Sequence, residues 1–333
     1  MVYTSGIAIP GNYPDNLTDP KLHALAIGYA PNEDDGEELI HEDVLPVVDL
    51  MGATEYTFQK YKPADAFTVV RTDVARTSRT PRVSFEHDII TSNTKDYGLE
   101  DAIPMREIDR AGLPMSAGAI ASSHAVGQQL MRLVKLDREQ RCANLVFNAS
   151  NYLPAQVQTL SGSSQFSDPS STPISVISAA MDAMLAKPNV MVLGQHGATA
   201  LFTNPQIVAS YQARTGVSLR AGGIVPMEYV ASLFGIKKVV VGTAYVTTGN
   251  PNIAGQVNLS RMWGNHMALL RVMPVTLPYS RTFGFTAYSG SVGQQWFDKE
   301  VGLYGGNVIR MGESVEECLC EAAYGFFVQN ITS

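Results

Sequence analysis

The chain has 333 residues, of which 45% are hydrophobic and 17% charged, a composition that indicates a folded protein with one large or two ordinary domains. Its 31 acidic and 24 basic residues give a formal net charge of -7, which argues against a protein whose main surface grips nucleic acid. The start of the sequence lacks the pattern of a secretory signal, and no apolar run reaches the roughly 18 residues of a membrane span. We therefore expect a protein made in the cytosol, with no membrane partner.

Residues 1–50 are rich in proline and glycine and carry an acidic run at 33–38, with weak periodicity. Such a segment cannot bury itself, so it is predicted to lie as an extended arm on other surfaces, including a neighbouring subunit. A loose tail is the alternative.

Strand-forming residues flank a basic stretch between Tyr56 and Ile90. The first group runs to Val70 and the second begins at Val83, which predicts a long hairpin with a polar, basic tip. A two-stranded ribbon is barely stable alone, so this hairpin needs a surface to lie on. Nucleic acid is an alternative partner, but the tip has no interleaved aromatic residues for stacking. The candidate contacts between subunits are the four tip arginines, Arg71, Arg76, Arg79 and Arg82.

Beyond the hairpin we expect a turn at Gly98 and a short helix opened by Pro104. A long helix is then predicted over residues 116–148, because apolar residues recur three to four apart: Val126, Leu130, Leu133, Val134, Cys142, Leu145 and Val146. The pairs Lys135 with Glu139 and Asp137 with Arg141 are expected on its solvent side. A rod of some thirty residues is about 45 Å long, so part of it should serve more than one compact core.

After residue 148 the pattern changes to short alternating strands and helices. A polar loop over 157–172 ends in the capping residues Ser171 and Thr172, and Pro173 begins a helix. A buried strand is predicted at 189–193, and two helices near 198–202 and 205–212 follow it. Another helix at 226–234 is stopped by Gly235, and strands are predicted at 236–246 and from Met267. This alternation predicts an α/β or α+β domain of roughly 130 residues. The last forty residues alternate with period two and are predicted to pair antiparallel and return to the long helix.

No familiar catalytic motif occurs in the sequence, and we predict no catalytic, cofactor-binding or metal-binding residues. His196 follows a predicted strand, where active sites often lie, and Ser163, Ser164 and Asp168 could complete a triad only on paper. The cysteines at 142, 318 and 320 are too few for a disulfide framework, so Cys318 and Cys320 are interpreted as packing residues rather than half of a metal site.

Several segments in this order resemble the major capsid proteins of tailed double-stranded DNA bacteriophages, which have the Hong Kong 97-type fold. The segment KDYGLED (95–101) is similar to the family's exit from its extended loop, and LDREQRCANLVFN (136–148) to the end of its spine helix. The stretch 160–184 resembles the link from the peripheral to the axial domain, and 189–208 and 233–246 resemble axial-domain elements.

The resemblance implies an α+β fold with five parts: an N-terminal arm (1–54), an extended loop (55–104), a peripheral domain with the spine helix (105–157), an axial domain (158–300) and C-terminal strands that return to the peripheral domain (301–333). It implies hexamers and pentamers that form an icosahedral shell around packaged DNA, with the protein assembled in the host cytoplasm and located in the virion. The implied protein partners are further copies of the chain, together with scaffold, portal and decoration proteins. The packaged DNA is expected to lie close to the shell without specific binding.

Some family members cross-link the extended loop through a lysine. Here the nearest lysines, Lys60, Lys62 and Lys95, lie at the base of the hairpin, so ion pairs and strand contacts are expected instead. The short arm after Met1 leaves no room for a built-in scaffold, which predicts a separate one. Two alternatives remain at this point: an encapsulin shell, which tends to open with a cargo-binding helix, and a cytosolic α/β enzyme that uses His196.

Overall fold

The computed structural model describes residues 25, 39–61, 69–70, 72–74, 76, 79–83, 87–106, 123–216, 223–248, 258–273 and 281–333. Its residues divide into two compact units, one within 97–134 and 291–313 and the other within 39–96, 135–290 and 314–333. Four elements pass from one unit into the other: β4 (Lys95–Pro104), α5 (Ser123–Val146), β11 (Gly284–Asp298) and β12 (Gly306–Leu319). Among the described helices, none has the length and apolar character needed to cross a membrane.

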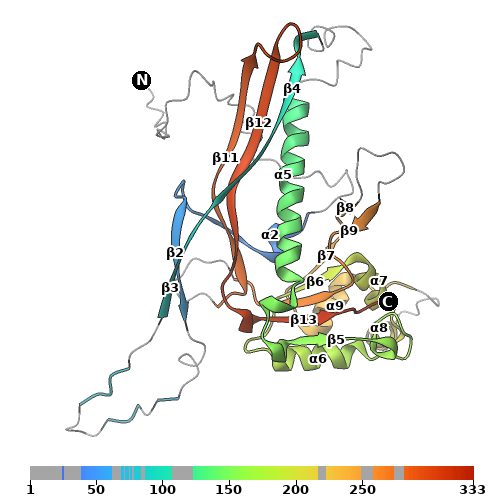
Figure 1. Ribbon diagram of the computed structural model, residues 1–333. Helices are drawn as coiled ribbons and strands as arrows, with labels where there is room; N and C mark the ends of the chain where they lie inside the picture. The colour runs from blue at the N-terminus through green and yellow to red at the C-terminus, as the bar shows by residue number, and fades with distance from the viewer. Residues whose placement is uncertain are drawn as a thin grey trace. The chain divides into compact units, whose positions relative to one another are not determined.

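A five-stranded mixed sheet is the centre of the larger unit (Figure 1). In spatial order its strands are β5 (Val157–Thr159), β13 (Gly325–Gln329), β10 (Met267–Leu270), β6 (Val190–Gly194) and β7 (Lys238–Gly242). The strand β10 runs antiparallel to both of its neighbours, whereas β6 and β7 are parallel. The strands predicted at 189–193 and from Met267 are confirmed as β6 and β10. The strand predicted over 236–246 is right only as β7, because the chain leaves this sheet after Gly242, and Tyr245–Thr247 form a separate strand of another sheet.

Both faces of this sheet are buried, and alternate residues of each strand serve different cores. Met191, Leu193 and Leu269 pack with four helices, α6 (Pro173–Ala183), α7 (Gln195–Thr203), α8 (Pro205–Thr215) and α9 (Met227–Phe234). Val192, Leu270 and Phe327 point to the other face, where they pack with the end of α5. Burial on both faces explains why β6 reads as an unbroken apolar run, VMVLG.

Proline and glycine set two of the predicted helix boundaries. Pro173 occupies the first position of α6, as predicted, although its N-cap Thr172 makes no side-chain capping bond and the Ser171 hydroxyl donates to the Asp168 carbonyl at 2.7 Å. Gly235 ends α9 in the left-handed conformation at φ 61°, which confirms the predicted stop. The remaining short elements of the larger unit are β8 (Tyr245–Thr247), β9 (Leu259–Arg261), η3 (Ala149–Asn151), η4 (Pro154–Gln156), η5 (Gly162–Ser164) and η6 (Ala322–Tyr324).

The prediction that residues 1–50 cannot bury themselves is wrong for residues 40–45. Helix α2 (His41–Val44) follows Ile40, and Ile40, Val44 and Leu45 are at most 1% exposed in the core that also contains the end of α5. The chain then forms β1 (Val47–Asp49), which pairs parallel with β11. The acidic run at 33–38 lies outside the described residues.

The predicted hairpin is present as β2 (Glu55–Tyr61) paired antiparallel with β3 (His87–Asn93). The described part of the pairing joins Glu55 to Asn93 and Tyr61 to His87. We expected pairing out to Val70 and Val83, but both residues are exposed and outside any strand. Valine at these positions reflects strand propensity without a second layer to bury it.

In the smaller unit, the buried residues Ile103, Leu130, Met131, Ile309 and Met311 bring together β4, β12 and the first half of α5. The turn predicted at Gly98 is wrong, because this residue lies inside β4. A Cβ there would lie 3.2 Å from the Met311 carbonyl oxygen, so the glycine permits close approach of two strands. Met105 and Arg106, which follow Pro104, are helical, as predicted.

The long helix is confirmed as α5 over 24 residues, and it ends two residues before Asn148, whose side chain accepts from the Ser150 N–H at 3.0 Å. The predicted helical residues 116–122 lie outside the description. Two expectations about its faces are wrong. Leu133 is 51% exposed rather than buried, and Lys135 and Glu139 are buried rather than solvated.

Candidate assembly surfaces

The base of the hairpin is fixed on the larger unit by aromatic packing. The rings of Tyr56 and Phe58 lie edge-on to Phe285, with centroids 6.1 and 5.7 Å apart. The Tyr56 hydroxyl lies 2.5 Å from the Cys318 sulfur, and burial raises the pKa of Cys318 to about 11. Cys318 and Cys320 pack against the same apolar cluster, which supports their interpretation as packing residues.

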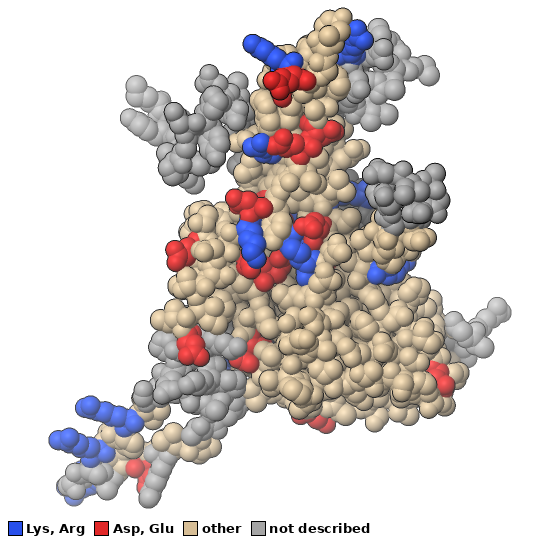
Figure 2. Space-filling model, viewed as in Figure 1, with Lys and Arg blue, Asp and Glu red and all other residues tan. Residues whose placement is uncertain are grey.

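The tip of the hairpin, by contrast, exposes both charge and apolar surface. Of the four candidate contact residues, Arg76, Arg79 and Arg82 are exposed, whereas Arg71 lies outside the described residues. Basic side chains accordingly project at the free end of the hairpin in Figure 2. Val69 is 97% exposed. The described part of the tip therefore has the composition of a contact surface without a core of its own.

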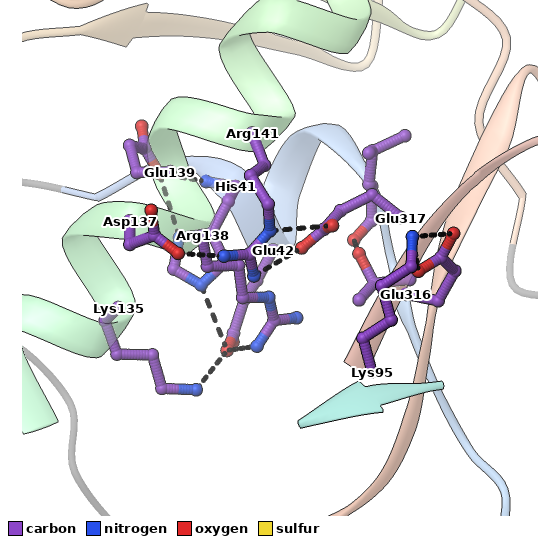
Figure 3. A network of polar contacts seen from close by, with 12 residues as sticks. His41, Glu42, Lys95, Lys135, Asp137, Arg138, Glu139, Arg141, Glu316 and Glu317 are labelled. Carbon is purple, nitrogen blue, oxygen red and sulfur yellow. Dashed lines mark hydrogen bonds and ion pairs between the residues drawn. The ribbon is translucent and has the colours of Figure 1, made fainter. Parts of the chain in front are cut away.

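Ion pairs tie strand β12 to its neighbours in the larger unit (Figure 3). The Lys95 ammonium lies 3.1 Å from Glu316 Oε2. The Arg141 guanidinium donates twice to Glu317, with Nε and Nη2 each 3.0 Å from a carboxylate oxygen, and it also pairs with Asp137. A bidentate pair of this kind has a defined geometry, so the predicted Asp137–Arg141 pair belongs to a larger network.

The buried Glu139 carboxylate is the most densely bonded polar group of the network. It accepts from the Ile40 N–H at 3.0 Å, from the His41 N–H and the His41 Nδ1 at 2.8 Å each, and from the Trp263 Nε1 at 2.6 Å. Figure 3 shows Glu139 on α5 with His41 directed toward it. These bonds compensate the cost of burying a charge, and they join three segments that are about a hundred residues apart.

Trp263 reaches Glu139 because glycine allows its ring into the sheet. The indole is fully buried, and a Cβ at Gly242 would lie 2.1 Å from its Cδ1 atom. Neither the buried position of Glu139 nor its bond to Trp263 was predicted from the sequence. A signal was present, since Glu139 lies three and seven residues before Cys142 and Val146 and hence on the buried face of the helix.

Glu42 adds a more exposed part to the network (Figure 3). One of its carboxylate oxygens lies 3.9 Å from Lys135 Nζ, 3.9 Å from Arg138 Nη1 and 3.7 Å from His41 Nε2. Two cations from α5 and one carboxylate from α2 therefore face each other across the contact of these two helices.

His196 lies on α7 at the edge of an open hollow of about 530 Å³. The hollow also contains Tyr245, over whose ring Arg261 stacks at 3.8 Å, and His266, whose pKa is lowered because its ring is partly buried. Two other candidates for a triad, Ser164 and Asp168, make hydrogen bonds elsewhere. Ser164 donates to the Ser161 carbonyl and Asp168 accepts from Ser170, both within their own loop. Within the described part of the chain, no group of histidine, cysteine, aspartate or glutamate is arranged to hold a metal.

Known proteins of similar sequence and structure indicate the class of this protein. No protein-family model matches the chain. The chain is 36% identical over 315 residues to the major capsid protein of Pseudomonas phage JBD67, with 94% of this chain and 96% of that protein covered. The structure is similar to a phage-related protein from Bordetella bronchiseptica RB50, with a TM-score of 0.69, 18% identity and 95% and 98% of the two chains covered. It is also similar to the capsid of cyanophage P-SCSP1u, with a TM-score of 0.56, 11% identity and 88% of each chain covered.

The architecture is therefore the mixed α+β, Hong Kong 97-type capsid fold. The chain belongs to the family of phage major capsid proteins, and it forms the shell of a phage head by association with its own copies. It is a structural protein of the virion rather than an enzyme, so the alternative in which His196 is catalytic is wrong. Membership of this family also decides against the encapsulin alternative.

Proposed function

We propose that the copies of this chain associate as hexamers and pentamers, which close into an icosahedral shell around double-stranded DNA. The observation that carries the proposal is the hairpin, which has a base packed in the larger unit and an exposed tip with arginines and valines. A ribbon of two strands gains little stability alone, so a neighbouring copy is the surface on which it rests.

In this proposal, each region of the chain has its own role in the shell. Residues 1–54 form an arm that is anchored in the larger unit at 40–49 and contacts neighbouring copies with its earlier part. Residues 55–104 form the extended loop, and 105–157 contribute the spine helix to a peripheral domain. The stretch 301–333 first returns to that domain and then adds β13 to the buried mixed sheet. Residues 158–300 form the axial domain at the centre of each capsomer. In support, three of the five strands of the buried mixed sheet, β6, β7 and β10, and all four helices on its one face fall within 158–300.

The proposal includes further partners besides the copies of this chain. A separate scaffold protein, a portal and decoration proteins would complete the head. DNA would lie near the shell without tight binding, because the chain has a net charge of -7. The tip sequence between residues 63 and 86 has no lysine, and Lys95 is engaged with Glu316, so the hairpin contact is non-covalent.

Replacement of Arg76, Arg79 and Arg82 by alanine tests the contact. Exposed ion pairs contribute about 0.5 kcal/mol each, so three of them amount to roughly 1.5 kcal/mol per contact, or about tenfold in affinity. We expect the threshold concentration for particle formation, measured by light scattering and electron microscopy, to rise at least tenfold while the circular dichroism of the subunit is unchanged.

A matched control removes three exposed basic side chains elsewhere: Lys187, Arg214 and Lys237. This control should assemble at nearly the original threshold. If the tip variant assembles as readily as the control, the hairpin arginines do not contact another copy.

A further inference from the structure

Glu139 is more than a packing residue of the core, because the hydrogen bonds described above reach it from outside its own helix. Its two carboxylate oxygens accept from two backbone N–H groups, of Ile40 and His41, and from the His41 and Trp263 rings. The carboxylate is fully buried. A charged group in such a place is stabilising only while those donors remain in position.

The donors mark the point at which the N-terminal part of the chain joins the larger unit. Ile40, Val44 and Leu45 pack in the core there, but apolar packing has no preferred direction. The hydrogen bonds to Glu139 do have direction, because they require the backbone at Ile40 and His41 to present its N–H groups to one side chain.

From this geometry we propose that Glu139 is a positioning residue for shell assembly. It fixes the point and the backbone orientation at which the chain enters the larger unit at residues 39–41, so that the N-terminal arm before this point meets a neighbouring copy in one register. The inference rests on the proposed function, in which the N-terminal arm contacts neighbouring copies.

The Glu139→Gln variant of the full chain tests the inference. Glutamine has the same shape but places an N–H₂ group where a carboxylate oxygen accepted hydrogen bonds. We expect hydrogen exchange at residues 39–45 to accelerate at least tenfold in the unassembled subunit, with no change in β6 or β10. The emission of Trp263, measured in a Trp296→Phe background, should shift because its indole N–H loses its partner. Particle yield should fall at least fivefold at a temperature where the subunit is fully folded.

A merely structural role is distinguished by a variant of similar stability. Ile177→Val removes one methylene from the core on the other face of the sheet, where Ile177 is fully buried. If this variant loses as much particle yield as Glu139→Gln at an equal shift in melting temperature, the positioning role is refuted. Normal particle yield from Glu139→Gln despite accelerated exchange at 39–45 would refute it too. If Glu139→Gln does not fold, His41→Ala, which removes a single donor, is judged by the same criteria.

The proposed function has its own test on the unaltered protein. Residues 1–38 should become protected from hydrogen exchange when subunits assemble. Without such protection the arm makes no contact and the proposed function fails at that point. Protection in the original particles, together with normal assembly of Glu139→Gln, would overturn only the role of Glu139.

Discussion

Leu45 is the residue through which the anchoring of the N-terminal segment can be measured. Its side chain is fully buried with Ile40 and Val44, and one of its methyl carbons would lie 3.0 Å from a Cβ at Gly284. Replacement by alanine removes this packing and leaves a cavity that tightly packed neighbours cannot fill. Substitutions of this kind cost about 3 kcal/mol, within a range of roughly 2 to 5 kcal/mol.

The expected effect on thermal unfolding follows from the size of the unit. For units of roughly 150 to 250 residues, 1 kcal/mol corresponds to about 2 to 4 °C, so Leu45→Ala should lower the melting temperature by about 6 to 12 °C. The measurement is differential scanning calorimetry of the unassembled subunit, since association would add its own stabilisation.

Leu303→Ala is the matched control, because the same atoms are removed from a side chain that is 82% exposed. It should change the free energy of unfolding by less than about 0.5 kcal/mol. Equal melting temperatures for the two variants would mean that residues 40–45 are not part of the core.

Two further predictions concern the interior of the larger unit. Gly242→Ala would force the Trp263 ring to move, because the new Cβ would lie 2.1 Å from it. We expect the free energy of unfolding, measured in urea, to fall by about 1 to 3 kcal/mol. Gly290→Ala is the control and should change it little, because no atom lies within 4 Å of a Cβ there. Stability should also fall between about pH 9 and pH 11, because the pKa of Cys318 is raised to about 11 and the unfolded chain therefore releases this proton first. The loss is up to about 3 kcal/mol, and it should be smaller in Cys318→Ala; a flat profile would contradict the burial of this thiol.

The sequence predicts the helices and strands wherever local periodicity and tertiary burial agree. Residues 190–194 form the predicted strand and α9 stops at Gly235, because apolar runs and a left-handed glycine need little context. The predicted hairpin is right at its base, where Tyr56 finds a partner surface, and too long toward Val70, where no second layer exists. Strand propensity alone carries no information about that layer.

The polar network could not be read from the sequence in the same way. Spacing of four residues gives Glu139 a helical neighbour in Lys135, but it does not reveal the hydrogen bonds to His41 and Trp263, which are far away along the chain. Likewise, Gly98 looks like a turn residue, and only the approach of Met311 shows that it permits two strands to come close. The exposure of Arg76 at the tip, by contrast, follows directly from a stretch with too few apolar residues to be buried.

The way the backbone threads the two compact units has a practical outcome for anyone who dissects this protein. One helix and three strands each begin in one unit and finish in the other, so no single cut in the polypeptide separates them. A fragment that starts or stops at any of these boundaries would carry half a helix or half a strand with nothing to complete it. Genetic isolation of either unit would therefore require its non-contiguous pieces to be rejoined by new linkers.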